Sequence, residues 1–115
     1  RNEGCNDALL HYEALIKKDE KDAEALEGKG LCLMAIGEQK EASKAFSDAL
    51  AIDPERWRTL NAIGILFAGK GKVPEAIAYF EKAAQIDESQ IAVMNNLGLS
   101  YLLDKRYDQA IETFQ

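Results

Sequence analysis

The chain of 115 residues is poor in the residues that build reaction centres and covalent cross-links. It contains one histidine and two cysteines. His11 has no cysteine, aspartate or serine partner at a fixed spacing, so neither a catalytic triad nor a zinc site is expected. Cys5 and Cys32 form no CxxC pattern, and Cys32 falls among packed helical positions, which favours a buried structural thiol. We predict no catalytic residue, no metal ligand and no cofactor, and we do not expect an enzyme.

Long apolar runs and clusters of basic residues are also missing. No run approaches the roughly 20 residues of a membrane span, and no signal peptide is visible. The net charge is −6, of which residues 1–56 carry −5 and residues 57–115 carry −1. Because phosphate binding needs clustered Lys and Arg, nucleic acid is not an expected partner. Direct binding to an anionic membrane is disfavoured for the same reason, and most charges are interpreted as a solvated surface.

One glycine-rich segment comes close to a phosphate-binding loop. Residues 64–71 read GILFAGKG, but the final Ser or Thr of that motif is absent, and the residues around it have helical periodicity rather than a strand's. We therefore interpret Gly64 as a packing residue and Gly69 and Gly71 as parts of a turn.

Several kinds of position recur along the chain at one constant step. Self-similarity at a period of about 34 residues is typical of stacked-repeat architectures, which generally present a surface to a partner. The positions that keep the step are Gly30, Gly64 and Gly98; Ala42, Ala76 and Ala110; Phe46, Phe80 and Phe114; and the pair Ala49 and Ala83.

Each period contains two helical patterns separated by a short break, as at Gly37. Asp53 is expected to end one repeat and to cap the next helix, with Pro54 in its first turn. Asp87, with Gln90 three residues later, offers a similar capping box. Pro74 is expected to start a helix rather than to kink one.

The repeated glycines fall in the middle of the first helix of each period, where glycine costs about 1 kcal/mol against alanine. We expect close approach of the second helix's backbone to compensate for this cost. Ala42, Ala76 and Ala110 would then be the facing small residues, and the repeated phenylalanines would fill the space one turn further on.

The pattern of leucine or a similar residue, x3, Gly, x2, aromatic, then Ala-x3-Phe-x2-Ala, resembles the tetratricopeptide repeat, a helix–turn–helix of about 34 residues. The resemblance covers essentially the whole chain and implies an all-α fold, a right-handed α-solenoid of stacked antiparallel helix pairs. It implies one array: residues 1–22 as the second helix of a partial repeat, residues 23–56 and 57–90 as repeats, and residues 91–115 as an incomplete repeat. Lys105, which replaces the turn glycine, is one departure from the family pattern.

The chain is therefore expected to be a piece of a longer protein. Ala110, Ile111 and Phe114 would be left uncovered, and the uncapped ends could stack on another copy of the chain.

In this family the resemblance places ligand contacts on the exposed side of each first helix. There, asparagines could pair with the backbone of an extended peptide, and an aliphatic row beside them could receive apolar side chains of an extended or helical ligand. The alternative is that these aliphatics pack against a neighbouring helix or another segment of the same protein. The candidate peptide-binding residues are Glu27, Leu31, Met34, Arg58, Asn61, Ile65, Asn95, Asn96, Leu99 and Leu102.

The sequence thus favours a scaffold that holds an extended or amphipathic helical segment of another protein in a concave groove. Capture of a terminal carboxylate is disfavoured, because Glu27 stands where such a site needs lysine. The alternative function is self-association through the terminal helices. Segments such as residues 93–100 also look like bacterial tight-adherence pilus-assembly repeat proteins, which would imply a periplasmic or outer-membrane setting. The compartment is otherwise unknown, with the cytoplasm as the default.

Overall fold

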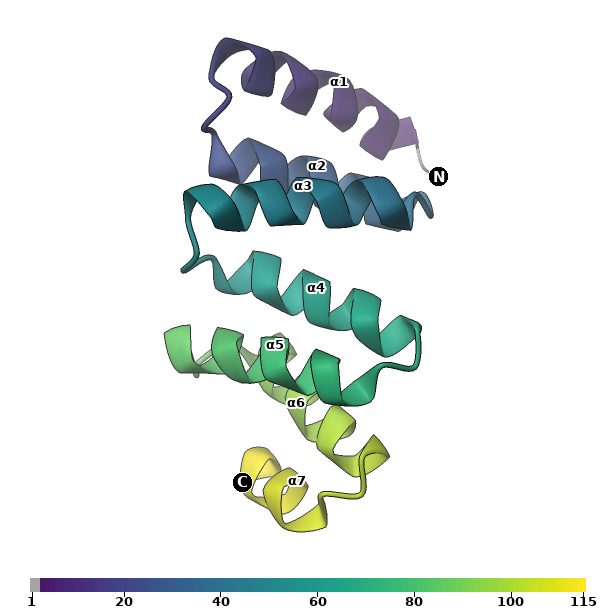
Figure 1. Cartoon of the computed structure of the whole chain (residues 1–115), viewed down its shortest axis with the longest axis vertical. Coiled ribbons are helices and arrows are strands. Elements are labelled where there is room, and N and C mark those ends of the chain that lie inside the picture. Colours follow the sequence, from purple (N-terminus) through teal and green to yellow (C-terminus); the bar gives the residue numbers. More distant parts are fainter. Residues whose placement is uncertain (1–2) are drawn as a thin grey trace. The chain divides into compact units, whose positions relative to one another are not determined.

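The computed structural model describes residues 3–115, and over these residues it contains seven α-helices and no strand (Figure 1). The expected all-α fold is confirmed. The chain divides into two compact units, residues 1–54 and residues 55–115, and each is described by itself. The helices are α1 (Glu3–Lys18), α2 (Ala23–Ala35), α3 (Gln39–Ile52), α4 (Trp57–Gly69), α5 (Val73–Ile86), α6 (Ile91–Leu103) and α7 (Tyr107–Phe114).

In the first unit, α2 packs against both α1 and α3. The fully buried ring of Phe46, from α3, lies against Gly30 of α2. A Cβ atom built on Gly30 would be only 2.4 Å from Cε1 of that ring, so only glycine fits there. Tyr12 of α1 lies equally close to Gly28, where an added Cβ would be 2.4 Å from Cζ of the tyrosine.

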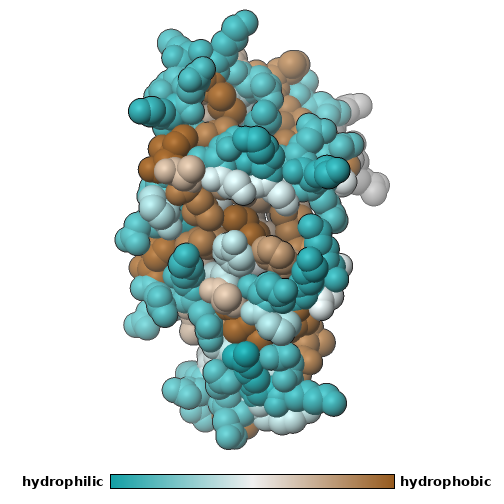
Figure 2. All heavy atoms as spheres, in the orientation of Figure 1, coloured by the Kyte–Doolittle hydropathy of each residue, from teal (hydrophilic) through white to brown (hydrophobic). Residues whose placement is uncertain are grey.

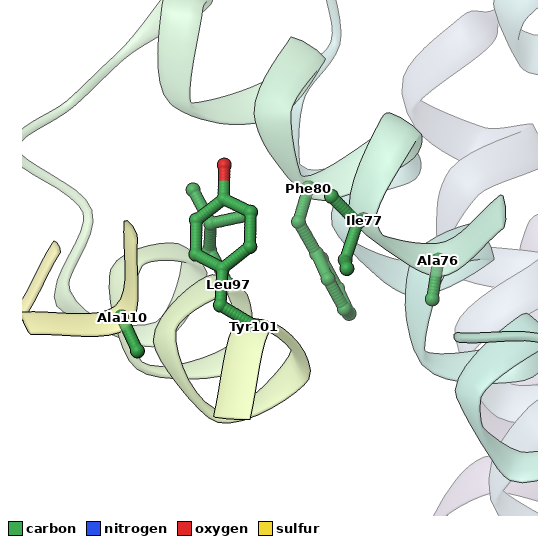
Figure 3. Packing of buried hydrophobic residues seen from close by; sticks show 6 residues of the cluster. All are labelled: Ala76, Ile77, Phe80, Leu97, Tyr101 and Ala110. Carbon is green, nitrogen blue, oxygen red and sulfur yellow. The ribbon is translucent and has the colours of Figure 1, made fainter. Parts of the chain in front are cut away.

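In the second unit, α5 packs against α4 and α6, and α6 packs against α7. Phe80 of α5 lies against Gly64 of α4, and Phe114 of α7 lies against Gly98 of α6. Figure 3 shows the core that joins the last three helices, with the Tyr101 ring of α6 facing side chains of α5. The residues drawn there are Ala76, Ile77, Phe80, Leu97, Tyr101 and Ala110.

These contacts correct one expectation about the repeated glycines. The atoms nearest to a Cβ added at each of these glycines belong to the phenylalanine ring of the second helix, and not to that helix's backbone or to its small alanines. The glycine therefore makes a recess for an aromatic ring. Burial of the ring offsets the conformational cost of glycine, since burying such a side chain stabilises a fold by about 1.5–3 kcal/mol.

The helix starts show which local signals were interpreted correctly. Pro74 lies in the first turn of α5, as predicted. Asp53 ends the helix α3 as its C-cap, as predicted, but the prediction that it also caps the next helix is wrong, because α4 begins only at Trp57 with Arg56 as its N-cap. The helix begins where the repeat register places it, and this register overrides the local capping signal of Asp53-Pro54.

The predicted capping box at Asp87 is also wrong. Asp87 is the C-cap of α5, and the N-cap of α6 is Gln90, whose side chain makes no capping hydrogen bond. The Asp87 carboxylate instead accepts hydrogen bonds from Gln90 Nε2 at 2.9 Å, and from Ser89 Oγ at 2.6 Å and Ser89 N at 3.0 Å. These bonds, with the Gln90 bond first, lower the pKa of Asp87 below its ordinary value. The carboxylate thus closes the turn between two helices.

The turns inside the repeats need a left-handed backbone at one position each. Gly37 has φ of 90° and Gly71 has φ of 77°. Lys105 holds the same place between α6 and α7 with φ of 61°, a conformation that is strained for a residue with a Cβ atom.

Charged and polar side chains cover much of the face drawn in Figure 2, with apolar patches among them. Ile111 and Phe114 of α7 are exposed, as expected, but Ala110 is buried, since it points back into the core shown in Figure 3. His11 is exposed on α1.

Candidate functional site

The candidate site of the second unit includes one side of α4, and the other side of this helix is buried in the core. Leu60 and Gly64 are buried against the neighbouring helices. Arg58, Asn61 and Ile65 follow one another at spacings of three and four residues, so they lie along one face of the helix. Arg58 is exposed, and the carbon of its guanidinium group lies 4.9 Å from the centre of the Trp57 ring.

A matching row lies on α6, which contacts α4 directly. Asn95, Leu99 and Leu102 repeat the spacing of four and three residues. The two helices are joined by a hydrogen bond of 3.1 Å in which Asn96 Nδ2 donates to Asn61 Oδ1. The set made of Arg58, Asn61, Ile65, Asn95, Asn96, Leu99 and Leu102 is called the α4–α6 face below.

Three aliphatic side chains of the α4–α6 face are open to solvent. Ile65 is 41% exposed, Leu99 54% and Leu102 42%. Single exposed aliphatic residues are common on any protein, but here two adjacent helices present them beside amide groups. Such a combination can receive apolar side chains of a ligand and also pair with its backbone.

The asparagines keep hydrogen-bonding capacity for such a ligand. Each side-chain amide has two N–H donors and an oxygen that can accept two bonds. The bond between Asn96 and Asn61 uses one donor of the first and one acceptor site of the second. Asn95 is exposed beside them. The bond fixes the orientation of the two amides and leaves the remaining donors and acceptor sites of each available to a ligand.

The candidate residues of the first unit differ from those on the α4–α6 face. Glu27 was expected to be exposed, and this is wrong, because it is only 3% exposed. Leu31 and Met34 are half-buried. Next to Glu27, the Tyr12 ring of α1 lies against Gly28, so α1 packs on this part of α2. Whether any candidate residue contacts a peptide stays a prediction.

Two polar contacts were missed at the sequence level. The bond between Asn61 and Asn96 joins positions 35 residues apart, whereas the repeat register pairs Asn61 with Asn95. Tyr101 Oη donates to Glu81 Oε2 at 2.5 Å. Burial first, and then this hydrogen bond and the charge of Glu81, raise the pKa of Tyr101 to about 12. Only the proximity of α5 and α6 could have indicated the second contact.

Concave hollows occur away from the α4–α6 face. One of about 350 Å³ lies between α2 and α3, and charged side chains of both signs line it. Lys44 and Asp48 at its edge form an ion pair of 2.8 Å, so the charge there is largely compensated. Its lining residues are Leu26, Lys29, Lys40, Glu41, Lys44, Ala45 and Asp48.

Within residues 3–115, no group of three or more His, Cys, Asp and Glu side chains is placed to hold a metal ion. In that same stretch, no helix combines the length and the apolar character needed to cross a bilayer.

Profiles of the tetratricopeptide repeat match residues 1–56, 37–91 and 91–115. The chain therefore belongs to the tetratricopeptide repeat family, whose domains generally mediate protein–protein interactions. Within each unit, the consecutive helices described above pack on one another as in this fold.

Curated relatives match part of the chain. Two are probable UDP-N-acetylglucosamine–peptide N-acetylglucosaminyltransferases named SPINDLY, from Solanum lycopersicum (39% identical) and Arabidopsis thaliana (41% identical). Each alignment covers 66 residues, which is 57% of this chain and 7% of the relative. The chain thus spans a small fraction of the relatives' length, and their transferase activity is a property of those proteins.

Solved structures match more of the chain. A crystal structure of MamA has a TM-score of 0.84 and 25% identity, over 96% of this chain and 64% of that one. The Naa15/Naa10 complex bound to HypK-THB has a TM-score of 0.80 and 24% identity, over 91% of this chain and 16% of that one, and shows the fold alone. The chain spans less than two thirds of either structure. None of these comparisons supports the resemblance to pilus-assembly proteins.

Proposed function

We propose that the α4–α6 face binds an extended or amphipathic helical segment of another protein. The observation that carries this proposal is the row of three exposed aliphatic side chains, Ile65, Leu99 and Leu102, on two helices in contact. Membership of a family that generally mediates protein–protein interactions supports the same conclusion.

The chemistry of the face favours an apolar or amphipathic ligand over a strongly charged one. Arg58 is the single charged residue of the face, and its guanidinium group lies close to the Trp57 ring. Asn61, Asn95 and Asn96 are neutral and can pair with the N–H and C=O groups of a peptide. Covering a half-exposed leucine with a ligand contributes about 1 kcal/mol, in line with the burial of apolar area.

Selection from a random peptide display library tests this proposal. Peptides enriched on the wild-type protein are synthesised, and their dissociation constants are measured by isothermal titration calorimetry. We expect Leu99→Asp to weaken binding at least about tenfold, since it removes apolar contact and leaves a carboxylate to be desolvated. Asn61→Ala, which removes the acceptor of the Asn96 bond, should weaken binding less.

The matched control is Leu10→Asp, because Leu10 is an exposed leucine of α1, outside the α4–α6 face. Circular dichroism confirms that each variant keeps its helices. Equal binding of the selected peptides to wild type and to the Leu99→Asp variant would contradict the proposal.

A second candidate function is self-association through α7. Ile111 is 57% exposed on this helix, whereas its counterpart one repeat earlier, Ile77, is 2% exposed in the core formed with α6. A second copy of the chain could cover Ile111 in the same way. Sedimentation over a range of concentrations tests this candidate: the mean mass should rise with concentration, and Ile111→Asp should abolish the rise. A mass that is independent of concentration contradicts it.

A further inference from the structure

The two cysteines of the chain belong to the same compact unit and to two helices that pack together. Cys5 lies near the start of α1, and Cys32 lies in the last turn of α2. Both are free thiols of intermediate exposure, so small reagents can reach them. The sequence, in which the two residues are far apart, did not indicate that they meet.

Contacts between α1 and α2 establish the register that brings them together. The Tyr12 ring lies against Gly28, and Lys29 Nζ forms an ion pair of 2.9 Å with Glu13 Oε1. Cys5 is seven residues, or two turns, before Tyr12 on α1. Cys32 is four residues, or about one turn, after Gly28 on α2. Because the helices are antiparallel, the two cysteines are offset along the axis by only about 4.5 Å, at about 1.5 Å per residue.

Both side chains lie on the faces by which the two helices contact each other. Cys5 is seven residues before Tyr12 on α1, and Cys32 is four residues after Gly28 on α2, and these spacings keep a residue on the same face of a helix. Burial first, and then the neighbouring Cys5 thiol, raise the pKa of Cys32 to about 11.

A covalent link between Cys5 and Cys32 would restrain α1, because this helix has few other contacts. Over the described part of residues 1–54, α1 packs against α2 and against no other helix. Its contacts at Tyr12 and Glu13 lie in the middle of the helix, well away from Cys5. A covalent bond near the start of α1 would therefore attach this end of the helix to α2. The contacts at Tyr12 and Glu13 attach its middle, and the turn that follows attaches its other end.

We propose that Cys5 and Cys32 form a reversible intramolecular disulfide that fastens the start of α1 to the end of α2. The oxidant is a low-molecular-weight disulfide such as oxidised glutathione. One cysteine thiolate attacks that disulfide, forms a mixed disulfide and releases one small thiolate. The second cysteine thiolate then attacks the mixed disulfide, which closes the protein bond and releases the other.

The exchange is balanced. Two electrons pass from the two protein thiols to the small disulfide, which is reduced to two thiols. The two protons lost by Cys5 and Cys32 end on these products. Reduced glutathione or a stronger dithiol reverses the reaction.

Incubation of the wild-type protein in glutathione buffers of graded redox potential tests the proposal. We expect monomeric protein whose intact mass falls by two hydrogens, and a proteolytic peptide pair that joins Cys5 to Cys32. In the oxidised protein, amide hydrogen exchange in α1 should slow by about tenfold or more, because a cross-link limits the opening of the segment that it closes.

Cys5→Ser and Cys32→Ser are the matched controls, and each should stop at the mixed disulfide with no change in the exchange of α1. The comparison of oxidised with reduced wild type needs no variant, so a folding defect in a control leaves the test intact. Mixed disulfides at both cysteines, or disulfide-linked dimers in place of the closed monomer, would overturn the proposal.

Discussion

Lys105 shows how a single residue can depart from its family without loss of the fold. It holds the turn between α6 and α7 with φ of 61°, where Gly37 and Gly71 hold the equivalent turns. The sequence identified the departure correctly, since Lys105 occupies the place of the turn glycine. The left-handed region costs a residue with a Cβ atom about 1–2 kcal/mol, so the strain at this position is small against the burial of the surrounding helices.

Lys105→Gly should therefore stabilise the protein by about 1 kcal/mol, partly offset by the greater freedom of glycine in the unfolded chain. Urea unfolding followed by circular dichroism measures the change. Gly71→Lys is the reciprocal control and should cost a similar amount, because it creates at φ of 77° the strain that the first variant removes. A loss of stability in the Lys105→Gly variant would count against this explanation.

Ionisation of Tyr101 makes the unfolding free energy depend on pH in the alkaline range. A tyrosine is neutral when protonated, and the folded state raises its pKa from 10.0 to about 12, by burial and then by the hydrogen bond to Glu81. Its contribution to stability is fully present below pH 10.0 and is lost as the pH rises to about 12. Tyr101→Phe should lack this loss in pH-dependent urea unfolding. Tyr79→Phe, which keeps the ring stacked on Phe67, is the control and should retain it.

At the scale of elements, one contact between a glycine and an aromatic ring recurs in three helix pairs. Gly30, Gly64 and Gly98 each receive the ring of a phenylalanine from the helix that follows. The repeat register predicted the pairing of helices and the importance of these columns. It could not predict that the ring, rather than the partner's backbone, fills the recess, since that depends on the side-chain rotamer.

Gly64→Ala should destabilise the protein by about 1–3 kcal/mol, because its Cβ would lie 2.5 Å from the Phe80 ring, which is fully buried and cannot move aside. Gly69→Ala in the same helix is the control: nothing lies within 4 Å of its added Cβ, and a gain of about 0.5 kcal/mol is expected. Thermal unfolding compares the two. Equal effects in both variants would show that the ring contact is unimportant.

Packing within the repeat also determines where the helices begin and end. Asp53 and Asp87 satisfy a local capping rule, yet both are C-caps of the preceding helix. Helices α4 and α6 start at Trp57 and Ile91, which stand one full repeat apart, as the register requires. Local propensity is a weak prior that packing of the whole repeat overrides.

At the scale of the whole molecule, the chain consists of two compact units, residues 1–54 and residues 55–115. Each unit has its own fully buried phenylalanine, Phe46 in the first and Phe80 in the second. In repeat proteins stability is approximately a sum of local terms. A destabilising substitution in one unit is therefore expected to increase local unfolding mainly in that unit.

Phe46→Ala and Phe80→Ala should each destabilise the protein by about 3–5 kcal/mol through loss of contacts and creation of a cavity. Amide hydrogen exchange should distinguish them. We expect Phe46→Ala to speed exchange mainly in residues 3–54 and Phe80→Ala mainly in residues 55–115. Each variant serves as the control for the other. Uniform acceleration along the chain in both would indicate a single cooperative unit instead.

The candidate site could be predicted from the sequence only in part. The repeat register selected Ile65 and Leu99, and both are exposed on helices that touch. It failed for Glu27, because the burial of a helical residue depends on where a neighbouring helix packs, and α1 packs on α2 next to this residue, with the Tyr12 ring against Gly28. It also missed the bond between Asn96 and Asn61, since the contact between successive first helices is offset from the register by one residue.

Trp57 is the single tryptophan of the chain, and its ring lies beside Arg58 on the α4–α6 face. Selective excitation of tryptophan therefore produces an emission spectrum that comes from one known point of the molecule. A ligand that settles against Arg58 would change the polarity around the indole and shift the emission wavelength. The protein thus carries its own optical reporter at the edge of the surface proposed to bind peptides, and a titration can be followed without attaching a dye.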